Sequence, residues 1–134
     1  MNYVYIAHSE NCNGEEQSMK QHSEGVAELM KSFALANDFA EIYSYCGLLH
    51  DIGKYSKGFQ KYIRANGDKE PHAKWGAYVA RKNKFINVAF PVIGHHAGLP
   101  NRDAMFEDLE ICAKDGNRWN PKIRKLSQWQ SQWQ

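Results

Sequence analysis

The stretch of sequence that decides the fold is DFAEIYSYCGLLHDIGK, residues 38–54. Its apolar residues recur at steps of three and four positions, which is the period of an amphipathic α-helix. The predicted inward face consists of Phe39, Ile42, Cys46 and Leu49. We expect a helix over residues 38–52, because Gly53 is typical of the position that ends a helix. His50 and Asp51 are therefore expected at the end of a core helix.

The same helical period recurs along most of the chain, and no pair of strands is expected. Other helices are predicted over residues 15–37, 57–64 and 101–114, with one beginning near Pro71 and one capped by Asn87 that ends between Gly94 and Gly98. Pro91 then falls in a first turn, where its missing N–H removes no helical bond. The residues predicted to face the core are Met19, His22, Val26, Leu29, Phe33, Phe59, Tyr62, Ile63, His72, Trp75, Gly76, Val79, Met105, Phe106, Leu109 and Cys112. The predicted fold class is all-α, a compact helical bundle.

Composition is that of one globular domain. The chain has 134 residues, of which 43% are apolar and 24% charged, and its net charge of +2 gives little information about partners. We expect one domain over residues 1–114 and a polar tail over 115–134 that carries three tryptophans and the tetrapeptide SQWQ twice. Three widely spaced cysteines without CxxC spacing, together with no membrane span or export signal, favour a cytoplasmic protein with reduced thiols.

Histidines at core-facing or helix-ending positions are the main functional signal. They are His22, His50 beside Asp51, His72, and the pair His95–His96. Taken singly, each has an ordinary interpretation: a buried histidine is usually a hydrogen-bonded core residue, and a double histidine is usually a surface turn. Taken together they favour a metal site, because borderline transition metals prefer imidazole with a few carboxylates. Two metals about 3.5–4 Å apart can clamp a phosphodiester and activate water.

Five motifs carry a family resemblance. They are YIAHS (5–9), HDIGK (50–54), FQKYIR (59–64), HAKWGA (72–77) and GHHAGLP (94–100). In this order and spacing they resemble the CRISPR-associated HD nuclease of the HD phosphohydrolase superfamily, which serves type I interference systems alone or fused to a helicase. The resemblance runs from about Tyr3 to Asn101. It implies a helical HD-domain bundle with the metal site between its helices, and it makes residues 1–114 an HD nuclease domain.

The resemblance also implies a role for each site residue. The first metal would be held by His22, His50 and Asp51. Asp51 would bridge to a second metal held by His72, His95 and His96. Lys54 would reach the scissile phosphate, although a solvated lysine at a helix C-terminus is the plainer interpretation. A histidine-rich set suits Mn, Fe, Co or Ni better than Mg, which prefers oxygen ligands.

The implied substrate is single-stranded DNA that a crRNA-guided surveillance complex exposes, cut without sequence preference during antiviral defence. Cations that could line a path for the DNA backbone are Lys54, Lys57, Lys61, Arg64, Lys74, Arg81, Lys82 and Lys84. Aromatic residues that could stack on bases are Tyr55, Tyr62 and Trp75. A solvated helix face and ordinary core packing are the alternatives for these residues.

One departure from the family pattern leaves two rival functions open. Family members usually supply a further aspartate to the first metal from a later helix, and Asp103, Asp108 and Asp115 follow the double histidine too soon to be equivalent. Either the sequence stops before that helix or the first metal lacks a ligand. One rival is an HD phosphodiesterase acting on cyclic dinucleotides or nucleotides, although no GYP motif follows the double histidine. The other is a domain that binds metal or DNA without turnover.

Overall fold

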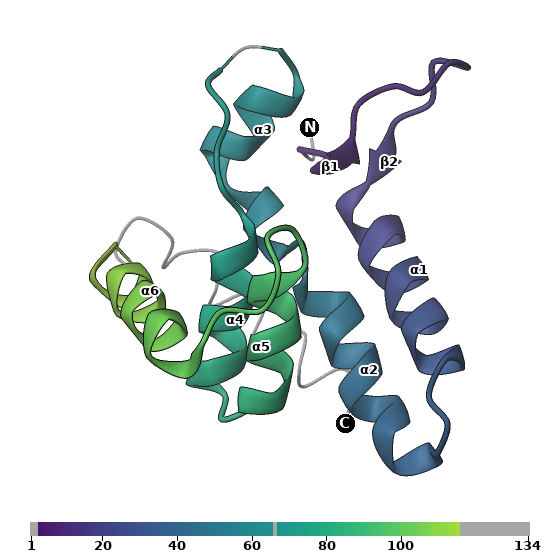
Figure 1. The fold of residues 1–134 in the computed structure, drawn as a ribbon. Coiled ribbons are helices and arrows are strands. Elements are labelled where there is room, and N and C mark those ends of the chain that lie inside the picture. Colours follow the sequence, from purple (N-terminus) through teal and green to yellow (C-terminus); the bar gives the residue numbers. More distant parts are fainter. Residues whose placement is uncertain (1–2, 66, 116–134) are drawn as a thin grey trace.

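The chain folds into a helical bundle with one very small sheet, so the predicted all-α class is confirmed. A computed structural model describes residues 3–65 and 67–115. Along these residues the elements are β1 (Ile6–His8), β2 (Gln17–Ser18), α1 (Met19–Ser32), α2 (Asn37–Leu49), the 3-10 helix η1 (Ile52–Tyr55), α3 (Lys57–Ile63), α4 (Ala73–Lys82), α5 (Ile86–Gly94) and α6 (Arg102–Asp115). Figure 1 shows α4 and α5 in the middle, with α6 on one side and the α1–α2 pair on the other.

The expectation that no strands pair was wrong. β1 and β2 form an antiparallel two-stranded sheet in which Ile6 lies opposite Ser18 and His8 opposite Gln17. α1 begins at Met19, whereas the helical period predicted a start near residue 15, because Gln17 and Ser18 belong to β2. The strands have three and two residues, too few for an alternating pattern to stand out in the sequence.

Ser18 sets the beginning of α1. Its hydroxyl accepts a hydrogen bond from the Gln21 backbone N–H at 3.2 Å, and the Gln21 side chain returns to the Ser18 N–H at 3.4 Å. This reciprocal capping box satisfies two donors that a bare helix start would leave unpaired, and an N-cap of this kind stabilises a helix by about 1 kcal/mol. His22 lies one turn further along the same helix.

α1 and α2 lie side by side (Figure 1). Gly47 allows this close approach, since a Cβ at that position would stand 2.5 Å from Ala27 Cα. The predicted inward faces were only partly right: Met19 and Cys46 are buried, whereas Leu29, Phe33 and Phe39 are exposed. Leu29 and Phe33 lie at the C-terminal end of α1 and Phe39 near the start of α2, and among the described helices α2 is the one that packs extensively on α1.

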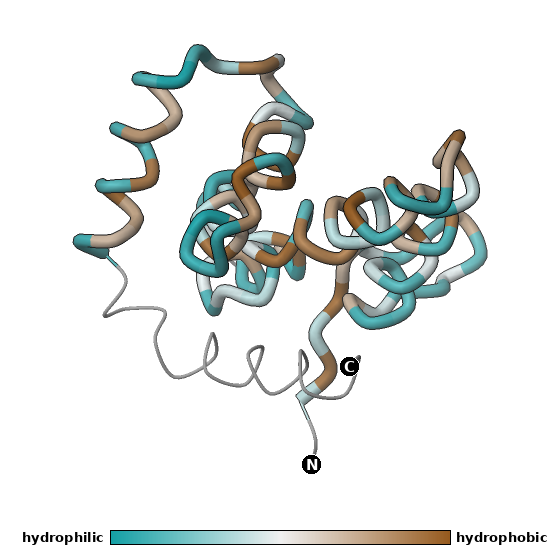
Figure 2. Tube along the Cα trace, turned by 90° about the horizontal axis from the view of Figure 1, so that it is seen from below, coloured by the Kyte–Doolittle hydropathy of each residue, from teal (hydrophilic) through white to brown (hydrophobic). Residues whose placement is uncertain are grey.

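The main core lies between α2, α4, α5 and α6. Its buried members are Cys46, Ala77, Ala80, Val88, Ala89, Val92, Met105 and Leu109. Hydrophobic and hydrophilic stretches alternate along these helices in Figure 2, as expected when one face of each helix is covered. Small residues on α4 and α5 let the two helices approach closely, and this contact places the end of α5 beside the start of α4.

Two helix starts differ from expectation. α5 begins at Ile86, so Pro91 lies beyond its first turn and inside the helix. The hydrogen bond that Pro91 cannot donate would have gone to the carbonyl of Asn87, an exposed residue. α4 begins at Ala73 with His72 as its N-cap, so Pro71 precedes that helix.

Most of the predicted tail, residues 116–134, lies outside the described residues. No helix in the described part of the chain has both the length and the apolar character needed to cross a membrane.

Candidate metal centre

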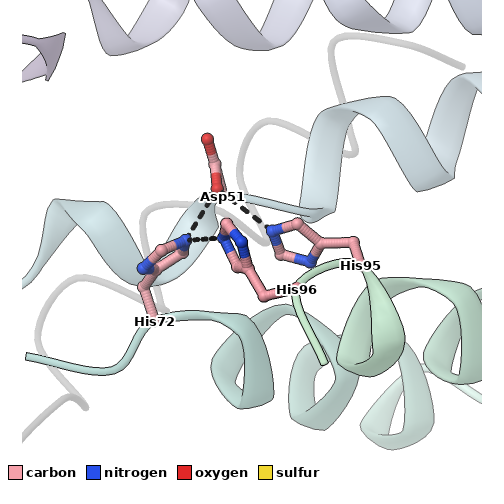
Figure 3. Close-up of side chains that lie close together, drawn as sticks. All are labelled: Asp51, His72, His95 and His96. Atoms are coloured by element: carbon pink, nitrogen blue, oxygen red, sulfur yellow. Dashed lines mark hydrogen bonds and ion pairs between the residues drawn. The ribbon is translucent and has the colours of Figure 1, made fainter. Parts of the chain in front are cut away.

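Asp51 stands at the centre of the histidine cluster, and each of its carboxylate oxygens faces a different group of side chains. Oδ2 lies 3.0 Å from His22 Nε2 and 3.2 Å from His50 Nε2. Oδ1 lies 3.0 Å from His72 Nε2 and 3.5 Å from His95 Nε2. Figure 3 shows Asp51 above the His72, His95 and His96 rings, with the ring nitrogens directed toward one shared space.

The ends of four helical segments bring these side chains together. His22 lies on the first half of α1, whereas His50 and Asp51 directly follow α2. His72 caps the start of α4, and His95–His96 follow the end of α5. The six predicted ligands therefore converge from positions up to 74 residues apart, from His22 to His96.

Glycine makes the approach of these segments possible at two points. A Cβ on Gly53 would overlap the His72 carbonyl oxygen and stand 2.6 Å from its Cα. A Cβ on Gly76 would overlap the carbonyl oxygen of Leu49, the last residue of α2. Since backbone atoms cannot yield as a flexible side chain can, both positions exclude larger residues. The glycine of HDIGK is therefore required for steric reasons, because the absence of a side chain at Gly53 lets His72 lie close to Asp51.

Three of the rings are held so that Nε2 faces inward. His50 Nδ1 lies 2.6 Å from the Gly47 carbonyl, and His95 Nδ1 lies 2.6 Å from the Val92 carbonyl. His22 Nδ1 lies 3.1 Å from Oε1 of Gln17. Because an oxygen of these types only accepts, Nδ1 carries a proton, so Nε2 is the nitrogen that donates to Asp51 when it is protonated and that has the free lone pair when the ring is neutral. An imidazole in this neutral state is the form that binds a metal.

The donor set fits divalent transition metals. Two groups have ligand atoms that all lie within 4.8 Å of one another: His22, His50 and Asp51, and Asp51, His72, His95 and His96. Within the groups, His22 Nε2 lies 3.2 Å from His50 Nε2, and His72 Nε2 lies 2.8 Å from His96 Nε2. Two lone pairs that face each other at such distances repel unless a proton or a cation lies with them. Neutral imidazoles with one shared carboxylate are ligands suited to borderline metals.

Electrostatics keep Asp51 ionised. Burial alone raises the pKa of Asp51, but hydrogen bonds from His22, His50, His72 and His95 outweigh burial and hold the pKa well below its ordinary value. Burial lowers the pKa of His96, and the neighbouring His95 and His72 rings lower it further. The pKa of His95 is raised, because its hydrogen bonds to Asp51 and the Val92 carbonyl outweigh the effect of burial. The centre therefore pairs one fixed anion with rings of unequal basicity.

Comparison with known protein families assigns the chain to one family. The family model described as HD domain matches residues 19–125, which is most of the chain. The chain belongs to the HD domain family. No curated protein and no solved structure matches it. HD domains are generally metal-dependent phosphohydrolases, and the histidine and aspartate residues of the candidate metal centre could hold a metal ion. The match continues past residue 114, where we expected the HD domain to end.

All six predicted ligands come together in this HD domain, and their binding of metal stays a prediction. Lys54 also lies at the candidate metal centre, although not at the end of a long helix as expected. It lies in η1 and is 7% exposed, so the interpretation as a solvated lysine was wrong. Its Nζ lies 2.8 Å from Asp51 Oδ2 and 3.3 Å from the Ala7 carbonyl oxygen.

Two residues beside the first group were not among the predicted site residues. Gln17 bonds His22 as described above, and the His8 ring packs edge-on against the His22 ring with centroids 4.9 Å apart. Burial and the nearby Lys54 lower the pKa of His8. YIAHS was part of the resemblance, so His8 could have been noticed. Gln17 carried no signal, because its role depends on the pairing of β1 with β2.

The further aspartate of the family pattern has no counterpart in the described part of this HD domain. Asp103, Asp108 and Asp115 lie on α6, and none belongs to either metal-binding group of the described residues. The sequence from residue 116 to 134 contains no aspartate, glutamate, histidine or cysteine. Among the described residues, the candidate ligands of the first group are therefore His22, His50 and Asp51.

The residues predicted to contact DNA divide into two sets. Lys57, Lys61, Lys82 and Lys84 are exposed, whereas Arg64 donates to the Val4 carbonyl oxygen at 2.7 Å and so holds the chain before β1. Arg81 lies over the Phe106 ring, and Lys74 lies over Trp75. Trp75 is buried against Ile52 and Cys112, so it does not offer a face for base stacking. Tyr62 remains exposed, and Tyr55 is half-buried against Tyr5.

Proposed function

We propose that the chain is a two-metal endonuclease that hydrolyses phosphodiester bonds, mainly in single-stranded DNA, in CRISPR type I interference. The observation that carries the proposal is the position of Asp51, whose two oxygens face two separate groups of imidazoles. A carboxylate placed in this way is suited to bridge two metals. The choice of DNA, and of the CRISPR system, rests on the resemblance of HDIGK, HAKWGA and GHHAGLP to the CRISPR-associated HD nuclease.

The residues that would hold each metal follow from the two groups. His22, His50 and Asp51 Oδ2 would hold the first, and Asp51 Oδ1, His72, His95 and His96 would hold the second. Such a pair of metals supplies activation of water and neutralisation of charge on the phosphate. The side chains of His95 and His96 are less buried than that of Asp51, so the second group lies closer to solvent. This exposure favours the entry of an extended strand.

The protein itself contributes charge and position. Asp51 is ionised across the physiological range, because its pKa is held well below its ordinary value. Lys54 uses one ammonium donor on Asp51 and one on the Ala7 carbonyl oxygen, which leaves a third donor for a phosphate oxygen. A cation fixed in this way stabilises the negative charge that develops as the phosphodiester is cleaved.

Binding of the strand would depend on phosphate contacts more than on reading of bases. The exposed cations Lys57 and Lys61 follow the HD motif on α3, and Lys82 and Lys84 follow α4. Such contacts are independent of sequence and weaken as the salt concentration rises. Non-specific cleavage requires another component to choose the target, and a crRNA-guided complex with a helicase, fused or separate, is the partner that we propose.

The test is a panel of substrates with one metal and two variants. The full chain, loaded with Mn²⁺, is mixed with circular single-stranded DNA, circular duplex DNA and cyclic di-GMP. A circular strand has no ends, so its loss reports endonuclease activity. Asp51→Asn removes the bridging charge, and Asp38→Asn is the matched control, because Asp38 is an exposed residue in the first turn of α2. We expect single-stranded circles to be cut by the parent and by Asp38→Asn only.

The other outcomes separate the rival functions. Hydrolysis of cyclic di-GMP with no action on DNA would replace the nuclease by a cyclic-dinucleotide phosphodiesterase with the same metal centre. Binding of Mn²⁺ without cleavage of any phosphodiester would identify a domain that binds metal without turnover. Equal cleavage by the parent and Asp51→Asn would contradict the assigned site.

A further inference from the structure

The rings of His22, His50 and His95 are oriented by different kinds of acceptor. His50 and His95 each bond a backbone carbonyl three residues earlier in their own chain segment. A carbonyl of this kind is present whatever the neighbouring side chain is. His22 instead bonds Oε1 of Gln17, a side chain outside its own helix. The orientation of His22 is therefore the one among these three that a single side-chain substitution can remove.

The position of Gln17 is fixed by the sheet. Gln17 lies in β2 opposite His8 of β1, and the Met19 N–H donates to the Tyr5 carbonyl at 2.8 Å. β1 is in turn held by Gln60, which is 1% exposed. The Gln60 amide accepts from the Ile6 N–H at 3.0 Å and donates to the Ile6 carbonyl at 2.8 Å, as a neighbouring strand would.

We infer that Gln17 is a positioning residue for the first metal, acting through His22 Nδ1. The inference rests on the proposed two-metal function and concerns a residue outside the two ligand groups. An amide oxygen can only accept, so its contact with Nδ1 selects the tautomer in which Nε2 is free to bind a metal. It also sets the rotation of the ring that directs Nε2 toward Asp51 Oδ2, 3.0 Å away.

The expected loss of metal affinity on substitution of Gln17 depends on what replaces its amide as the hydrogen-bond partner of His22. Without Gln17, His22 can take the other tautomer or rotate, and each alternative removes a ligand from the first group. Residues that orient metal-binding histidines change metal affinity by roughly 10- to 100-fold. We expect a value near the lower end, because Gln17 is exposed and water can replace part of its hydrogen bond.

The experiment is a calorimetric titration of the full chain with Mn²⁺ alone. Gln17→Leu removes the acceptor, and Gln17→Glu restores one. Gln21→Leu is the control, because Gln21 caps the same helix start without touching His22. We expect Gln17→Leu to weaken one of two Mn²⁺ sites about tenfold and Gln17→Glu to restore affinity. Gln21→Leu should lower thermal stability and leave Mn²⁺ affinity unchanged. Parent-like affinity in Gln17→Leu, or equal weakening in Gln21→Leu, would overturn the inference.

A double-mutant cycle with His22→Ala distinguishes positioning from a general structural effect. Once His22 is absent, Gln17→Leu should cause no further loss of Mn²⁺ affinity, whereas an unrelated effect would add to that of His22→Ala. The readout needs no substrate. If the parent binds two Mn²⁺ but cuts no phosphodiester, the proposed function fails while the role of Gln17 stands. If the parent binds no Mn²⁺, both fail.

Discussion

The ammonium nitrogen of Lys54 lies 2.8 Å from Asp51 Oδ2, the same oxygen that faces His22 and His50. Lys54 follows Asp51 by three positions, along one turn of 3-10 helix. Both are buried, and the Ala7 carbonyl oxygen from β1 holds the other side of the ammonium. The lysine of HDIGK is therefore directed into the centre and belongs with its charged groups.

Substitution of Lys54 should affect turnover more than metal loading. Lys54→Met keeps the chain length but removes the cation, and loss of one donor to a developing anion typically reduces the rate by roughly 100- to 1,000-fold. We expect that reduction in the cleavage of circular single-stranded DNA, with the number of bound Mn²⁺ ions unchanged. Lys31→Met, at an exposed position in the last turn of α1, is the control and should cut nearly as well as the parent. Loss of a metal from Lys54→Met would show that the lysine acts on the ligands instead.

Gly53 should resist even the smallest substitution. Gly53→Ala places a Cβ against the backbone of His72, and overpacking of this kind destabilises proteins by about 1–3 kcal/mol. The free energy of unfolding, measured by urea denaturation, should fall by that amount, and the shift of His72 should weaken Mn²⁺ binding. Gly25→Ala is the opposite case. Gly25 lies inside α1 with nothing within 4 Å of an added Cβ. The free energy of unfolding of Gly25→Ala should therefore rise by about 0.5–1 kcal/mol, because alanine favours the helix over glycine. Equal effects of the two substitutions would contradict the packing described for η1 and α4.

The three cysteines should differ sharply in reactivity. Cys12 is exposed, whereas Cys46 and Cys112 are buried. Burial raises the pKa of the Cys112 thiol to about 11. Between pH 9 and 11 the unfolded chain would lose this proton first, so stability should fall as pH rises through that window. In native protein at pH 8, a disulfide reagent should label Cys12 rapidly and Cys112 only after urea is added. Rapid labelling of Cys112 without urea would mean that the contact between α4 and α6 opens readily.

The helices and the histidine cluster could be predicted because both follow from spacing along the chain. The 3.6-residue period placed Trp75, Val79, Met105, Leu109 and Cys112 on faces that are buried in the structure. The motifs HDIGK and GHHAGLP contain residues that the fold brings together. The spacing of apolar residues does not show which neighbouring element covers a given helix. Leu29 and Phe33 share the helix face of Met19, yet they are exposed, because among the described helices only α2 packs extensively on α1.

The sheet and the residues that it positions could not be predicted. Two strands of three and two residues carry no periodic signal, so the residues of β2 were predicted within a helix and those of β1 within no helix or strand. Gln17 and the Ala7 carbonyl reach the metal centre only because β1 pairs with β2 and Gln60 holds Ile6. A contact made by pairing across the chain depends on tertiary structure and is not visible in a local motif.

The most direct test of the central claim, that Asp51 bridges two metals, is electron paramagnetic resonance of the full chain titrated with Mn²⁺. The account predicts two Mn²⁺ ions per chain and a spectrum of two exchange-coupled ions, because one carboxylate would join them. In Asp51→Asn the coupling should vanish, and in His72→Ala one ion should remain with the spectrum of isolated Mn²⁺. A single uncoupled Mn²⁺ in the parent protein, or a coupled pair that survives in Asp51→Asn, would contradict the account.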